Sequence, residues 1–165
     1  MHLRKHYCLS QSEVSGHLKS SNIKMKLKHN YKTIFEIGGE GGSISISRHA
    51  DENSVKYIYS HNELDPTDEG LAVHKMDEYD SFEEPFQIIN NKYSWYNLFV
   101  QTIHEDYREY IIRNLIYKLN MKKISPDYFH WSKSRLEKTL RIKLTYDIDE
   151  KNELVWNFHD SLIDD

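Results

Sequence analysis

The stretch Ile34-Phe-Glu-Ile-Gly-Gly-Glu-Gly-Gly-Ser-Ile-Ser-Ile-Ser47 contains four of the chain's six glycines. The residues before the glycines are β-branched and aromatic, and the residues after them alternate serine with isoleucine, which is typical of strands. Glycine is favoured where the backbone needs a positive φ or a close approach. The cluster therefore predicts a hairpin turn with a β-bulge, and we expect a sheet to grow outward from it. The expected turn residues are Gly38, Gly39, Glu40, Gly41, Gly42 and Ser43.

The segments around this hairpin predict a three-stranded antiparallel meander. Its strands are expected at about 32–37, 43–49 and 55–60, and the run Asp51-Glu-Asn-Ser54 supplies turn residues between the last two. Residues 62–80 are acidic and contain Pro66 and Gly70, so they predict a long connection. One face of the meander is apolar and needs a cover.

The second half of the chain predicts the helices that provide this cover. Helices are expected at 81–92, at 103–120 and at 125–140, the second beginning with a capping box from Thr102 to Glu105. Residues 93–99 predict an aromatic corner in the core. Alternation at 142–148 and 154–158 predicts a C-terminal hairpin. The predicted fold class is α+β: an antiparallel meander with helices packed on one face. Residues 31–165 are expected to form this single domain, preceded by a polar, basic extension over 1–30.

Composition excludes several classes of protein. The single cysteine, Cys8, allows neither a disulfide within the chain nor a cysteine-based zinc site. There is no run of 18 apolar residues and no leader pattern, so a soluble cytoplasmic protein is expected.

No motif in the sequence predicts catalysis, a cofactor or a metal. The glycine cluster lacks the lysine of a phosphate-binding loop and precedes a strand, whereas nucleotide motifs precede a helix. The run His104-Glu-Asp-Tyr-Arg108 has arginine where a zinc-protease helix has its second histidine. Two other interpretations stay open. One is a small metal-dependent or other enzyme, in which His49, His61 and His74 join nearby carboxylates at a metal site. The other is a nucleic-acid binder that uses the basic segments 1–32 and 111–145.

Charge is unevenly distributed along the chain. Residues 33–110 carry sixteen acidic and five basic side chains, whereas residues 111–145 carry two acidic and nine basic ones. A dense acidic surface attracts positively charged partners over long range and repels nucleic acid. The predicted partner-binding residues are the acidic side chains of the segment from 51 to 84: Asp51, Glu52, Glu63, Asp65, Asp68, Glu69, Asp77, Glu78, Asp80, Glu83 and Glu84.

The glycine turn, the acidic segment, the corner Trp95-x-x-Leu98 and the helix start His104-x-x-Tyr107 together resemble small bacterial proteins with a "GAEGGSI" turn. Such proteins occur among the immunity proteins of polymorphic toxin systems, including contact-dependent growth inhibition. The resemblance covers about residues 31–120. In its Trp–Leu corner this chain has Phe99 and Val100 where the family pattern has a proline.

The resemblance implies a function. It implies an immunity protein that binds one cognate toxin domain, one to one, and covers its active site or substrate groove. Many such toxins are nucleases with basic clefts, and an acidic surface would take the place of the phosphates there.

Overall fold

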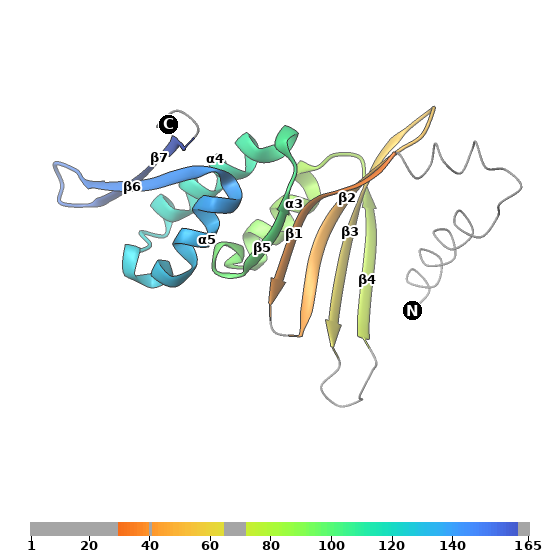
Figure 1. The fold of residues 1–165 in the computed structure, drawn as a ribbon, viewed down its shortest axis with the longest axis horizontal. Coiled ribbons are helices and arrows are strands. Elements are labelled where there is room, and N and C mark those ends of the chain that lie inside the picture. Colours follow the sequence, from red (N-terminus) through yellow and green to blue (C-terminus); the bar gives the residue numbers. More distant parts are fainter. Residues whose placement is uncertain (1–29, 40, 65–71, 162–165) are drawn as a thin grey trace, which may run out of the picture.

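The computed structural model describes residues 30–39, 41–64 and 72–161. The expected extension over 1–30 lies outside these ranges except for its last residue. The described part is α+β, as predicted (Figure 1). Its main sheet has five antiparallel strands in the order β4-β3-β2-β1-β5. These strands are β1 (Tyr31–Gly39), β2 (Gly42–Ala50), β3 (Val55–Leu64), β4 (Ala72–Tyr79) and β5 (Phe99–Ile103).

The glycine hairpin lies at the centre of this sheet, as expected. Gly39 pairs with Gly42, and Gly41 between them has a φ of 83°. Glu40 itself lies outside the described residues. Gly42 is needed for space, because a Cβ added there would lie 2.3 Å from the backbone oxygen of Asn62 on β3.

The prediction of a bulge in the turn was wrong, because Gly38 pairs with Ser43 and Gly39 with Gly42 without a shift in register. A bulge lies instead within β1. The register of β1 against β2 shifts between Thr33 and Phe35, which leaves Ile34 as the extra residue. A bulge turns neighbouring side chains out of strict alternation. As a result Ile34 and Phe35 are adjacent in sequence and are both buried.

The connection expected over 62–80 is mostly strand. β3 continues to Leu64, and β4 begins at Ala72. The two strands pair in register from Leu64 opposite Ala72 to Tyr57 opposite Tyr79. β4 is an edge strand, and of its side chains from His74 to Tyr79 only Met76 is buried, so its sequence lacks clear apolar alternation. The segment predicted as an aromatic corner leads into a second edge strand, β5, which the sequence did not predict. There Phe99 is exposed and not in the core.

The three predicted helices are present, with corrected ends. They are α3 (Glu83–Lys92), α4 (Glu105–Met121) and α5 (His130–Leu140), with short 3-10 helices η2 (Trp95–Asn97) and η3 (Pro126–Phe129). The capping box at Thr102 was wrong, because Thr102 belongs to β5. His104 caps α4 instead, accepting a hydrogen bond from the backbone N–H of Asp106. The segment 125–140 is not one helix, since η3 precedes α5.

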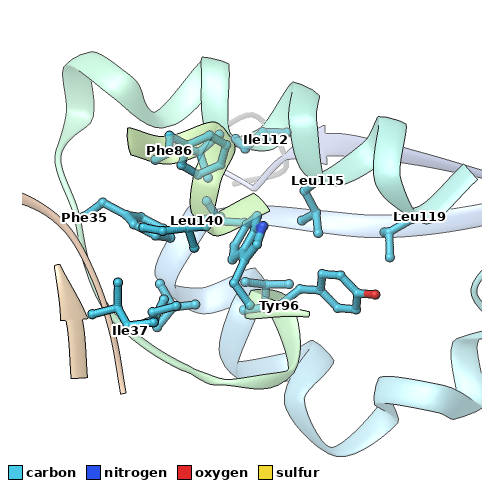
Figure 2. Close-up of a cluster of buried hydrophobic side chains, with 14 of the residues drawn as sticks. Phe35, Ile37, Phe86, Tyr96, Ile112, Leu115, Leu119 and Leu140 are labelled. Carbon is cyan, nitrogen blue, oxygen red and sulfur yellow. The ribbon is translucent and has the colours of Figure 1, made fainter. Parts of the chain in front are cut away.

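The helices cover one face of the sheet at the β1–β5 side and enclose the core (Figure 2). Phe35 on β1 makes edge-to-face contacts with Phe86 of α3 and Trp95 of η2, at ring-centroid distances of 5.4 and 5.6 Å. Trp95 is buried, as the predicted aromatic corner requires, and its indole N–H donates to the Asn90 side chain at 2.8 Å. Ile112, Leu115 and Leu119 present the apolar stripe of α4 to the same core.

The predicted C-terminal hairpin consists of β6 (Ile142–Ile148) and β7 (Leu154–Asp160), and it packs on α4 and α5 away from the main sheet (Figure 1). Asn120 of α4 acts toward Trp156 as a neighbouring strand would, because its side-chain oxygen accepts from the Trp156 N–H at 2.6 Å and its amide donates to the Trp156 carbonyl at 3.2 Å. The Trp156 indole donates to the Ile124 carbonyl at 2.7 Å. Arg108 adds an ion pair to Asp160.

Buried tyrosines make the fold sensitive to high pH. Burial raises the pKa of Tyr59, Tyr96 and Tyr107 above the usual value near 10, and the hydrogen bond between the hydroxyls of Tyr57 and Tyr107, at 2.9 Å, adds to the shift for Tyr107. Above pH 10 the unfolded chain loses these protons while the folded chain keeps them. Stability that is fully present below pH 10 is therefore lost as the pH rises.

We expect the free energy of unfolding to fall above pH 10 by about 1.4 kcal/mol per pH unit for each buried tyrosine. Denaturant titrations between pH 8 and pH 11.5 measure the slope. The variant Tyr59→Phe removes one titrating group and should flatten it. A slope that Tyr59→Phe leaves unchanged would show that Tyr59 does not contribute.

Candidate protein-binding surface

Carboxylates from two separate stretches of the chain, 51–52 and 78–84, meet at one end of the main sheet, which we call the acidic end. The β2–β3 turn and the last residues of β4 both lie at this end, the upper end in Figure 1, and α3 begins just after β4. All six side chains of the acidic end are exposed. They are Asp51 and Glu52 of the turn, Glu78 and Asp80 at the end of β4, and Glu83 and Glu84 in the first turn of α3.

Two of these carboxylates have local structural roles. Asp51 accepts hydrogen bonds from the backbone N–H groups of Asn53 and Ser54 at 2.8 and 2.7 Å, which shapes the turn. These bonds hold the pKa of Asp51 below its usual value. Asp80 forms an ion pair with Lys56, and this contact joins the end of β4 to the start of β3. Glu83 and Glu84 lie where the positive end of the α3 dipole favours negative charge.

Basic side chains lie beside the acidic end on its β1 side. Lys32 of β1 pairs in register with Arg48 of β2, and Arg48 in turn pairs in register with Tyr57 of β3. Arg48 is half-buried and lies close enough to Tyr107 to lower the pKa of that phenol, against the larger effect of burial. The negative surface is thus bounded on one side, and it extends over the β2–β3 turn, the end of β4 and α3.

The first turn of α4 adds further acidic side chains that the candidate set from 51 to 84 did not include. The phenols of Tyr57 and Tyr107 are hydrogen bonded, and the Tyr107 ring lies 4.5 Å from that of Phe82, just before α3. These contacts hold the start of α4 against the acidic end. Glu105 and Asp106 are both exposed there, although Glu105 also pairs with Arg141. The acidic first turn of the predicted helix was the signal that could have found them.

The remaining candidate residues do not join this surface. Asp77 shares the helix-covered face of β4, is half-buried, and lies 3.9 Å from Lys75. Glu63 is exposed at the opposite end of β3, beside Gly42 in register, which is roughly 26 Å from Val55 at strand spacing. Asp65, Asp68 and Glu69 lie outside the described residues. The acidic segment of the sequence is therefore divided between the two ends of the sheet.

Two partly exposed aliphatic side chains lie among the carboxylates. Val55 begins β3 next to the β2–β3 turn and is 37% exposed, and Ile88 on α3 is 39% exposed. Ile88 follows Glu84 by four residues, so both lie on the outer face of the helix. Protein interfaces combine an apolar centre with a polar rim. The acidic end has both components.

The histidines proposed as metal ligands do not come together. His61 lies on the helix-covered face of β3, where its ring contacts Tyr93, whereas His74 lies on the other face beside Asn62. His49 shares that other face but pairs in register with Lys56, six residues from Asn62 along β3. Within the described ranges there is no group of three or more histidine, cysteine or acidic side chains that could hold a metal ion.

Comparisons with known proteins add no relative: no protein-family model, no curated protein and no solved structure matches this chain. In the part of the chain that the structure describes, no helix is long and apolar enough to cross a membrane.

Proposed function

We propose that this protein is an immunity protein that binds a toxin domain one to one and neutralises it. The acidic end covers the basic substrate groove of the toxin, which is of the nuclease type. The observation that supports this most is the convergence of six exposed carboxylates from two stretches of the chain, 51–52 and 78–84, at one end of the main sheet.

The chemistry of the surface fits this role. Exposed carboxylates offer the same negative charge as a phosphate backbone, and the field of such a surface accelerates capture of a basic partner. Val55 and Ile88 provide apolar area that becomes buried on binding and slows dissociation. The long-range attraction therefore sets the association rate, and the aliphatic contacts set the lifetime of the complex.

The first experiment coexpresses the chain with the product of the gene directly upstream, and tests rescue from its toxicity and recovery of a one-to-one complex. Rescue and a stable complex are the expected results. Strongly salt-dependent binding to DNA or RNA, with no rescue, would instead favour the nucleic-acid interpretation through the basic region 111–145.

The variant Glu83→Lys with Glu84→Lys is expected to slow association with the toxin by roughly tenfold to a hundredfold at low salt, because it reverses charge within the acidic end. Stopped-flow or surface-plasmon measurements at several salt concentrations give the rate. The matched control reverses Asp147 and Glu150 instead, two exposed acidic residues of the C-terminal hairpin. Equal slowing in both variants would refute the acidic end as the binding surface.

A further inference from the structure

The second charged region of the molecule is a cavity at the other end of α4. Since α4 has 17 residues, the cavity lies about 25 Å from the acidic end. Its volume is about 350 Å³, within the usual size of small-molecule sites. Its polar lining consists of Ser94, Tyr96, Lys122, Lys123, Ser125 and Tyr128, all of which can donate hydrogen bonds, and it includes no carboxylate.

Lysines at the end of a helix are often explained by the helix dipole alone. Here the helix dipole does not explain why the Lys118 side chain is buried. Lys118 is only 7% exposed, and its ammonium group donates to the Tyr93 carbonyl at 3.0 Å, next to Ser94 of the cavity wall. Burial and the neighbouring Lys122 lower the pKa of Lys118. Among the described residues no carboxylate forms an ion pair with Lys118 or Lys122, so this positive charge lacks a protein counter-ion.

Lys123 is held in an unusual backbone conformation. Its φ is 51°, at the position after a helix where glycine is normally preferred. The helix end is closed by hydrogen bonds from the N–H of Lys123 to Asn120 and from the N–H of Ile124 to Leu119, at 3.2 and 3.0 Å. A non-glycine residue costs stability in this conformation. Its side chain lines the cavity, and its ammonium group also lies 2.9 Å from Glu153.

We propose that this cavity binds a phosphate group. Lys122 supplies the main positive charge, Lys123 adds a charge that it shares with Glu153, and the hydroxyls of Ser94, Ser125 and Tyr128 supply donors for the several oxygens of a tetrahedral anion. The Tyr128 ring is 58% exposed and forms a wall on which an aromatic group attached to the phosphate can stack. The phosphate belongs either to a small molecule or to a nucleic-acid backbone, and both present the same chemistry to these donors.

A second cavity, lined by residues of η3, α5 and β6, has a lining of mixed charge. It has a volume of about 480 Å³ and is lined by Asp127, His130, Lys133, Glu137 and Tyr146 among others. Its opposite charges satisfy each other, since Lys133 lies 3.4 Å from Glu137, and Glu137 also accepts from the Leu144 N–H. The lining also includes Asp127, so this cavity presents two carboxylates that would repel an anion.

The test is an NMR titration of the full chain with inorganic phosphate, with adenosine monophosphate and with a short single-stranded oligonucleotide. We expect saturable shifts of the backbone amides of Ser94, Ile124 and Ser125, with phosphate binding in the millimolar range or tighter. Tighter binding of the mononucleotide identifies a small-molecule phosphate. Tighter binding of the oligonucleotide at the same amides identifies a nucleic-acid backbone.

Three variants test whether phosphate binds in this cavity and not elsewhere on the protein. Lys122→Ala should weaken phosphate binding about tenfold, whereas Lys138→Ala, which removes an exposed lysine of α5 outside the cavity, should not. Lys123→Gly should weaken binding without lowering the melting temperature, because glycine relieves the backbone strain. Shifts that do not saturate, shifts confined to other amides, or equal weakening by Lys138→Ala would overturn the proposal. Lys122→Ala should leave toxin binding unchanged, so the two proposals fail separately.

Discussion

Replacing Gly42 with alanine is expected to destabilise the protein by about 3 kcal/mol or more, or to prevent folding. The added Cβ would lie 2.3 Å from the Asn62 oxygen and 3.1 Å from the Glu63 Cα, both of which are backbone atoms. Backbone in a paired strand cannot move aside without breaking the ladder between β2 and β3. β2 is the middle strand of the five, so the damage extends to both sides of the sheet.

Gly38→Ala is the matched control for this substitution. The Cβ added at Gly38 would lie 2.8 Å from the Nε2 atom of the Gln101 side chain, which is exposed and can rotate away. The expected loss is below about 1 kcal/mol. Urea denaturation of both variants gives the free energies of unfolding. If Gly38→Ala were as harmful as Gly42→Ala, the close approach of the Asn62 backbone to Gly42 would not explain the loss of stability.

Trp156→Ala is expected to cost about 3–5 kcal/mol and to release the C-terminal hairpin from the helices. The side chain is buried, its ring centroid lies 5.4 Å from that of Phe129, and its indole N–H donates to the Ile124 carbonyl. A two-stranded hairpin is at best marginally stable alone, so β6 and β7 depend on this contact. Hydrogen exchange should show early loss of protection in both strands.

The control for Trp156 is its neighbour Val155. Val155 points to the outer face of β7 and is 38% exposed, so Val155→Ala should change stability by less than about 0.5 kcal/mol. A melting transition of Trp156→Ala that matches the wild type would mean that the hairpin contributes nothing to the stability of the rest. Retained protection in β6 and β7 would show that the hairpin does not depend on the Trp156 side chain.

The spatial grouping of the charged side chains could not be predicted from the sequence. The charge count identified an acidic segment correctly, but a contiguous segment is not a contiguous surface. β3 carries Glu63 away to the glycine-turn end, while antiparallel pairing brings the end of β4 back beside the β2–β3 turn. The lysines at the end of α4 were explained by the helix dipole alone. Their role in a cavity depends on Ser94, which is 28 residues away from Lys122 in sequence and is close to it only through packing.

The sequence by itself determined the features that depend on neighbouring residues: the glycine hairpin, the meander around it, the three helices and the C-terminal hairpin. Periodicity and turn chemistry act over a few residues, so they can be recognised without the fold. Only the tertiary structure decided the bulge at Ile34, the edge strands β4 and β5, and the grouping of charges at the two ends of α4. These features depend on which distant segment packs against each residue, and that choice is made by burial of the whole core.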